Sequence, residues 1–219
     1  MHAGDVKSAR ILVVDDHPIV RLGIRQMLSE ESALKICAET DSAEAAIEAL
    51  RHGGADLAIV DLSLAGKNGL ELIREMREVA PDLLVLVLSM HDESLFAERA
   101  LRAGARGYIT KHQAIGGLVG AIRDVLAGRI YVSPNVSNGL LERLGGNRIA
   151  PGGRLGNLTD RELQVFELIG RGSNTIEIAK TLGVSVKTIE TYRSNIKVKL
   201  HLKDAADLVR AATSWIEQL

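Results

Sequence analysis

The 219-residue sequence has almost no cysteine and no excess of charge of either sign. Cys37 is the only cysteine, which excludes a disulfide within the chain, and its apolar neighbours favour a small buried side chain. Lys and Arg number 27 against 28 Asp and Glu, so overall charge does not point to a nucleic-acid or membrane partner. Hydrophobic residues make up 46% of the chain, which excludes a mainly disordered protein.

Long hydrophobic segments are also missing. The longest purely aliphatic run, Leu83–Leu88, is far too short for a bilayer, which requires roughly 20 residues. The first residues lack the apolar stretch of a secretory signal. We therefore expect a cytoplasmic protein with no membrane partner.

Short aliphatic runs alternate with longer helical patterns between residues 10 and 127. The expected strands are 11–14, 34–38, 57–60, 83–88 and 107–109, and the expected helices are 18–30, 43–52, 69–79, 93–103 and 114–127. Five such units predict an α/β domain, a flavodoxin-like, doubly wound parallel sheet of order 2-1-3-4-5 with helices on both faces.

Glycine and proline interrupt this pattern over residues 128–156, which we expect to form a linker with one short helix at 135–144. Within it, we place the interdomain connection itself at about 145–156. Residues 157–219 then predict a small all-α domain of four helices, with a helix-turn-helix at about 174–197. The expected caps are Thr159 with Glu162, Asn174 and Ser185; Gly183 ends the second helix, and Asp204 lies in the first turn of the last.

Three carboxylates and two other polar side chains follow the predicted strands. Asp15 and Asp16 end the first strand, Asp61 ends the third, and Ser89 and Lys111 follow the fourth and fifth. Strands 1 and 3 are neighbours in the predicted order, so the three carboxylates should converge at one edge of the sheet. Mg²⁺ would offset their repulsion, and a phosphoryl group could then be received with Asp61 as the nucleophile.

Each of these residues has a plainer interpretation when taken alone. Aspartates after strands commonly cap helices, and a lysine in a loop is usually solvated; five such residues at the ends of four strands favour a shared site. No glycine-rich dinucleotide turn follows the first strand, and no Gly-Lys-Ser/Thr phosphate loop is present. A metal-dependent phosphohydrolase with an aspartyl nucleophile stays an alternative.

Four motifs within residues 10–127 resemble a known family. They are Val14-Asp15-Asp16-His17-Pro18, Val60-Asp61-Leu62-Ser63-Leu64 with Gly66 to Gly69, Leu88-Ser89, and Gly104 to Lys111 with its Gly107-Tyr108-Ile109-Thr110 core. This set resembles the receiver domain of two-component response regulators. One departure is Ala65, where many relatives have proline.

The resemblance implies a role for each residue of the site. Asp61 would be the phosphoacceptor, Asp15 and Asp16 would shape the Mg²⁺ pocket with the backbone carbonyl of Ser63, Ser89 and Tyr108 would form a switch pair, and Lys111 would bind phosphate. A sensor histidine kinase would supply the phosphoryl group. A receiver that functions without phosphorylation, its acidic pocket serving only folding, is a further alternative.

The second candidate site is the predicted helix 185–200, where basic residues are concentrated. Between residues 185 and 203 the chain has five Lys or Arg and only Glu190 as an acid. Steps of about 100° per residue place Ile189, Ile196 and Leu200 inward. The outward and flanking residues, candidates for DNA contacts in a major groove, are Lys187, Thr188, Glu190, Thr191, Arg193, Ser194 and Lys197.

The plainer interpretation of this helix is a solvated face on which Glu190 pairs with Lys187 or Arg193. The capped helix before it favours DNA binding instead. Residues 158–214 also resemble the LuxR-type helix-turn-helix, through Leu158-Thr159-Asp160-Arg161-Glu162, Glu177-Ile178-Ala179, Leu182-Gly183-Val184-Ser185, Lys187-Thr188-Ile189-Glu190 and Lys199-Leu200.

The whole chain thus resembles a response regulator of the NarL/FixJ class. The resemblance implies that helix 185–200 binds double-stranded promoter DNA, that the last helix, about 204–216, offers a dimer face, and that phosphorylation produces a homodimer. RNA polymerase is a further candidate partner. Asn174 stands where many relatives have Ser, and because both residues cap helices we expect no loss.

Overall fold

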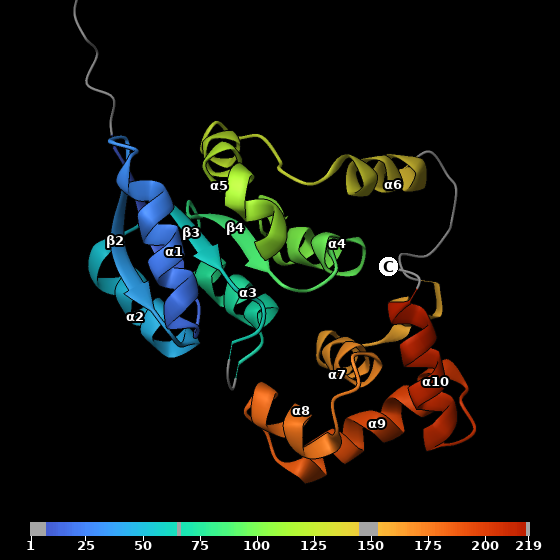
Figure 1. Cartoon of the computed structure of the whole chain (residues 1–219). Helices are drawn as coiled ribbons and strands as arrows, with labels where there is room; N and C mark the ends of the chain where they lie inside the picture. The colour runs from blue at the N-terminus through green and yellow to red at the C-terminus, as the bar shows by residue number, and fades with distance from the viewer. Residues whose placement is uncertain (1–7, 65–66, 145–152, 218–219) are drawn as a thin grey trace, which may run out of the picture. The chain divides into compact units, whose positions relative to one another are not determined.

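The computed structural model describes residues 8–64, 67–144 and 153–217, and it contains two compact units that divide between Asn138 and Gly139 (Figure 1). This division falls within the segment 128–156 that the sequence predicts as a linker. Most of the expected linker at 145–156 lies outside the described residues, and so do Ala65 and Gly66. Among the described residues, no helix is long and apolar enough to cross a membrane.

The first unit contains a five-stranded sheet of order β2-β1-β3-β4-β5 in which every pair of neighbours is parallel, as predicted. Its strands are β1 (Ala9–Val14), β2 (Leu34–Thr40), β3 (Leu57–Val60), β4 (Leu84–Ser89) and β5 (Gly107–Thr110). Its helices are α1 (Pro18–Ser29), α2 (Ala43–Gly53), α3 (Gly69–Val79), α4 (Glu93–Ala103) and α5 (Lys111–Leu126).

Helices cover the sheet on both faces (Figure 1). The central strands β3 and β4 are therefore buried on both sides, which disfavours polar side chains within them. On one face Ile11, Val13 and Ile59 join a core cluster with Ile24 of α1 and Leu118 of α5. Successive side chains of a strand point to opposite faces, so the residues between them pack on the other side. All four residues of β3 are buried. The carboxylate of Asp61 therefore comes only after β3 ends, at the edge of the sheet where the site lies.

Helix α5 begins at Lys111, three residues earlier than the sequence pattern indicated. Thr110 caps it: the Thr110 hydroxyl accepts from the backbone N–H of Gln113, and the Gln113 side chain accepts from the Thr110 N–H. Such a capping box satisfies amide groups that the first turn leaves free. It also places Lys111 on a rigid helix and not in a loop.

Two residues lie elsewhere than expected. Cys37 is exposed, because β2 is an edge strand and its register with β1 shifts between Ile11 and Leu12. Tyr131 falls in the predicted linker but pairs with β5: its carbonyl accepts from the N–H of Tyr108 at 2.8 Å, and its N–H donates to the carbonyl of Arg106 at 3.0 Å. The chain therefore stays attached to the sheet beyond residue 127.

Helix α6 (Pro134–Leu144) spans the division between the units and matches the short helix expected at 135–144. The described residues from 153 onward form no strand. They contain a short 3₁₀ helix η1 (Gly153–Asn157) and the four expected helices α7 (Asp160–Gly170), α8 (Thr175–Leu182), α9 (Val186–Leu200) and α10 (Ala205–Ile216). The expected caps Thr159, Asn174 and Ser185 are present, Asp204 is itself the cap of α10, and Gly183 ends α8 at a φ of 65°.

Candidate functional site

The three predicted carboxylates converge where β1 and β3 end. Asp15 and Asp61 are each only 1% exposed, and the backbone N–H of Asp61 donates to the carbonyl of Val14 at 2.9 Å, which aligns the two strand ends. Ligand atoms of Asp15, Asp16, His17 and Asp61 all lie within 4.8 Å of one another. The strand order therefore brings together residues that are 46 positions apart in the sequence.

Lys111 lies between two of these carboxylates. Its Nζ is 2.7 Å from Asp15 Oδ2 and 2.7 Å from Asp61 Oδ2, and its side chain is 12% exposed. Burial by itself would lower the pKa of Lys111, but the nearby charges and hydrogen bonds of Asp61 and Asp15 outweigh it, so the pKa lies above its usual 10.5. The ammonium group therefore stays charged and offsets part of the carboxylate repulsion.

The loop after β3 holds the Asp61 side chain from the other side. The backbone N–H of Ser63 donates to Asp61 Oδ1 at 3.2 Å. Helix α3 starts directly against this loop, where Gly69 donates to the carbonyl of Leu62 at 3.2 Å. A Cβ on Gly69 would lie 2.5 Å from the backbone oxygen of Asp61, so only glycine allows this approach.

The donor set fits a hard divalent cation. Carboxylate and carbonyl oxygens are the ligands that Mg²⁺ prefers. Asp15 Oδ2 and Asp16 Oδ1 are buried atoms that contact Lys111 and His17, and a carboxylate oxygen with one such partner keeps a second lone pair. Their lone pairs are thus available to an ion at this edge of the sheet.

The two residues expected to form a switch are tied to the loop after β4. Ser89 and Tyr108 are fully buried; Ser89 Oγ accepts from the N–H of His91 at 3.2 Å, and the Tyr108 hydroxyl donates to the carbonyl of His91 at 3.0 Å. The resemblance implies that these two residues form a switch pair, and both contact the same backbone segment at His91. The Tyr108 side chain is fully buried in this structure.

Two histidines beside the site carried no predicted role. His91 is 7% exposed, its Nε2 lies 2.9 Å from Ser63 Oγ, and its ring stacks on Phe96. His17 Nδ1 lies 2.6 Å from Asp16 Oδ1. The position of His17 directly after Asp15 and Asp16 could have indicated that its side chain lies at the acidic site. No local signal links His91 to Ser63, because they are 28 residues apart and meet only through the strand order.

Helix α9 presents the face that the sequence predicted. Ile189, Ile196 and Leu200 are buried. Of the predicted DNA-contacting residues, Lys187, Glu190, Thr191 and Ser194 are exposed, and Thr188, Arg193 and Lys197 are half-buried. Two hydroxyls are already engaged: Thr188 Oγ1 lies 2.8 Å from Ser185 Oγ, and Thr191 Oγ1 donates to the carbonyl of Lys187 at 3.1 Å.

The charged groups of this face are free of the pairing that the plainer interpretation required. Within the described part of the chain, Glu190 forms no ion pair with Lys187 or Arg193. The sequence reasoning omitted Asn195 and Val198, which are also exposed on α9. The helical period could have identified both, because residues three, four or seven positions apart share a face, and Asn195 and Val198 each lie four positions after a predicted contact residue.

Comparisons with known proteins identify the family of each part of the chain. The response regulator receiver domain family matches residues 11–123, and the luxR family of bacterial regulatory proteins matches residues 156–212. Transcriptional activator protein ExaE of Pseudomonas putida is 36% identical over 92% of this chain and 94% of its own length.

Two solved structures of RcsB extend the comparison to three dimensions. RcsB from Salmonella enterica serovar Typhimurium, bound to promoter rprA in the presence of phosphomimetic BeF3-, is 26% identical with a TM-score of 0.64, covering 94% of this chain and 98% of that one. A structure of two RcsB dimers bound to two parallel DNAs is 28% identical with a TM-score of 0.57 and the same coverage.

These matches span both units of the chain. The receiver match covers the strand ends that carry the carboxylates, and the luxR match covers the helix-turn-helix. The chain therefore belongs to the response regulators of the NarL/FixJ class, transcription regulators with a receiver domain followed by a LuxR-type DNA-binding domain.

Proposed function

We propose that this protein is a phosphorylation-controlled transcription regulator that accepts a phosphoryl group on Asp61 from a sensor histidine kinase. One observation carries the proposal: Asp61 is buried at the end of β3, with the ammonium group of Lys111 bridging it to Asp15 at 2.7 Å on each side. Burying these carboxylates is costly unless positive charge accompanies them. A phosphoryl-transfer site provides a reason for that cost.

The contacts of Asp61 define how its neighbours act. A carboxylate oxygen of Asp61 forms a bond to phosphorus while the bond from phosphorus to the donor histidine nitrogen breaks, and the departing imidazole takes up a proton. Lys111 and the Ser63 N–H, which both contact Asp61, are placed to bind the phosphoryl oxygens. Mg²⁺, which Asp15, Asp16, Asp61 and the Ser63 carbonyl would hold, offsets negative charge at the site when bound.

The signal would leave the site through the loop after β4. New phosphoryl oxygens offer the Ser89 hydroxyl a partner, and turning toward them breaks its hydrogen bond with the His91 N–H. Tyr108 holds the carbonyl of the same His91, so a shift of this loop changes the environment of β5. A local electrostatic change thereby biases the conformation of the whole receiver domain.

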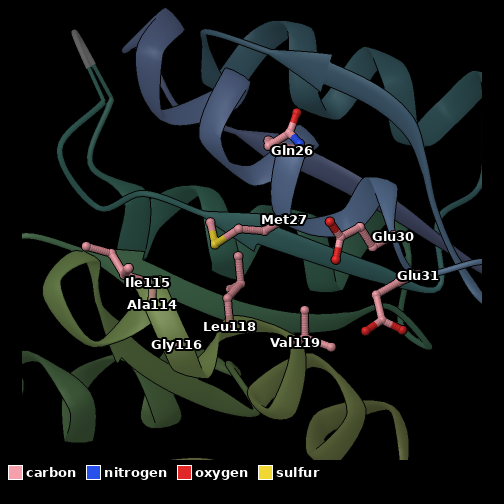
Figure 2. A pocket seen from close by; sticks show the side chains of 9 residues that line it. All are labelled: Gln26, Met27, Glu30, Glu31, Ala114, Ile115, Gly116, Leu118 and Val119. Carbon is pink, nitrogen blue, oxygen red and sulfur yellow. The ribbon is translucent and has the colours of Figure 1, made fainter.

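Exposed apolar residues on α1 and α5 support pairing of phosphorylated receivers. Ile19 and Leu22 of α1 are 73% and 52% exposed, and Ile115 of α5 is 83% exposed. Ile115 also lines a hollow of about 370 Å³ between the two helices, with Met27 and Leu118 among its neighbours (Figure 2). Burying such a surface against a second copy is favourable, at about 25 cal/mol per Å² of apolar area.

The DNA-binding unit offers its own pairing face on α10, where Ala205, Ala206 and Val209 are exposed. Two paired α9 helices would then contact two half-sites of a symmetric promoter sequence. We expect the phosphorylated protein to sediment as a dimer and Ile115→Glu to keep it monomeric. A phosphorylated Ile115→Glu variant that still dimerises would remove α5 from the receiver interface.

The central experiment is phosphorylation by radiolabelled acetyl phosphate in Mg²⁺. Asp61→Asn should abolish labelling, whereas Asp82→Asn, which changes an exposed aspartate before β4, should leave it intact. Label on the Asp61→Asn protein would remove Asp61 from the central role, and an unlabelled wild type would favour a receiver that works without phosphorylation. Multiple turnover on small phosphoesters would favour the phosphohydrolase alternative.

A further inference from the structure

The side chain of His17 is turned toward the acidic site and not toward the helix that it caps. His17 precedes α1, and its imidazole makes no capping hydrogen bond. Its backbone N–H donates to Asp15 Oδ1 at 2.8 Å. Its Nδ1 lies 2.6 Å from Asp16 Oδ1 and 3.3 Å from Asp15 Oδ1. The ring therefore forms part of the acidic cluster, while the start of the helix does not depend on it.

The spacing of these three atoms suits ligands of one ion. Neighbouring ligands of a six-coordinate ion with bonds of about 2.1 Å stand about 3.0 Å apart. The two distances from His17 Nδ1 lie on either side of this value, and an Asp61 oxygen belongs to the same 4.8 Å cluster. Asp16 Oδ1, the atom nearest to the ring, is buried and accepts no hydrogen bond of suitable geometry.

We infer that His17 is a nitrogen ligand of the divalent ion at this site, and that it shifts the preference of the site from Mg²⁺ toward first-row transition ions. Sites built only of oxygen favour Mg²⁺, whereas an imidazole nitrogen strengthens binding of Mn²⁺, Co²⁺ and later ions. The His17 side chain is 60% exposed, so small rotations onto an ion displace no packed neighbours. This inference rests on the proposed function, because it concerns the same ion.

Electron spin echo spectroscopy of the full-length protein loaded with Mn²⁺ tests the inference directly. A coordinated imidazole modulates the echo of the Mn²⁺ electron spin, so we expect nitrogen modulation in the wild type and its loss in His17→Ala. His52→Ala, which removes an exposed histidine of α2, should retain the modulation. Calorimetric titrations with Mg²⁺ and Co²⁺ should show the preference for Co²⁺ falling about tenfold in His17→Ala.

Each outcome separates this inference from the proposed function. Mn²⁺ that binds the wild type without nitrogen modulation overturns the role of His17 and leaves the acidic site in place. Modulation that survives His17→Ala and disappears in His91→Gln assigns the nitrogen to His91 and also overturns it. A wild type that binds neither Mn²⁺ nor Mg²⁺ contradicts the proposed ion site itself. Circular dichroism of His17→Ala should match the wild type, because the imidazole caps nothing.

Discussion

The two sites of this protein differ in how the chain assembles them. The proposed phosphoacceptor site combines residues between positions 15 and 111 from the ends of four strands, whereas the proposed DNA-contacting face lies between residues 187 and 197 of α9 alone. The first depends on the order of strands in a sheet, and the second on the period of one helix. A site assembled from distant strands is sensitive to every element that holds it, but a helix face is a sum of nearly independent side chains.

Burial makes the contrast stronger. Asp15 and Asp61 are 1% exposed and share the ammonium group of Lys111, while Lys187 and Glu190 of α9 stand in solvent. Charges interact much more strongly in a low-dielectric interior than in water. We therefore expect large losses from single changes at the first site and graded losses at the second.

The largest effect is expected from Lys111→Met. The change removes the cation between Asp15 and Asp61, and the loss of one preorganised charge at such a site typically costs about 100-fold or more in rate. Acetyl phosphate labelling measures this rate. Lys35→Met, an exposed lysine of β2, is the matched control and should behave as wild type. An unchanged rate in Lys111→Met would mean that the bridging contact has no part in the chemistry.

A pair of glycine substitutions should damage the two units separately. A Cβ on Gly69 would lie 2.5 Å from the Asp61 oxygen, and one on Gly170 would lie 2.4 Å from the Ala212 oxygen. Overpacking of this kind costs about 1–3 kcal/mol, so Gly69→Ala should destabilise the receiver and Gly170→Ala the helical unit. Urea unfolding followed by the fluorescence of Trp215, the only tryptophan, reports the helical unit, and circular dichroism reports both.

The control for this pair is Gly120→Ala on α5, where a Cβ would meet nothing within 4 Å. Alanine is favoured over glycine within a helix by about 1 kcal/mol, so this variant should be slightly more stable than wild type. If Gly69→Ala also lowered the stability that Trp215 reports, the two units would not unfold independently, and the comparison drawn between them would need revision.

DNA binding should respond in smaller steps and in two distinguishable ways. Truncating Arg193 or Lys197 to alanine should weaken binding to every sequence and reduce the salt slope by about 1, because each neutralises one phosphate. Changing Glu190 or Ser194 should instead alter which bases are preferred, by about 1–3 kcal/mol per contact. Mobility-shift titrations over a range of salt measure both, with Lys35→Ala as control. No change in either class would mean that α9 is not the recognition helix.

The smallest effect concerns Glu162, which caps α7 and pairs with Lys199 of α9 at 2.6 Å. Burial alone would raise the pKa of Glu162. The hydrogen bonds from Lys199 and Thr159, together with the positive charge of Lys199, outweigh this effect, so the pKa lies below its usual 4.5. A lowered pKa in the folded state contributes stability above pH 4.5 that is lost as the pH falls through the folded value.

Glu162→Gln keeps the amide contacts of the cap and removes only the ion pair, so it should cost about 1 kcal/mol at neutral pH. This difference should vanish as the pH falls below 4.5, as measured by Trp215 fluorescence during urea unfolding. Glu177→Gln is the matched control, because Glu177 accepts from the N–H of Asn174 in a similar capping box and has no lysine partner in the described part of the chain. A constant difference at all pH values would contradict the ion-pair contribution.

Most of the fold followed from local patterns, and the errors also have local causes. Aliphatic runs located the ends of all five strands to within two residues, and Thr159, Asn174 and Ser185 located the starts of three helices. The predicted start of α5 was wrong because the capping box of Thr110 was overlooked. The predicted burial of Cys37 was wrong because strand patterning cannot distinguish an edge strand from a central one.

The sequence by itself determined the alternation of strands and helices, the caps and the outward face of α9, because hydrophobic period and capping are properties of neighbouring residues. Only the tertiary structure decided that Lys111 bridges Asp15 and Asp61, that His91 meets Ser63, and that His17 turns toward Asp16. The contacts of Lys111 and His91 depend on strand register across the sheet, and the contact of His17 depends on its side-chain rotamer. No short stretch of sequence encodes either one.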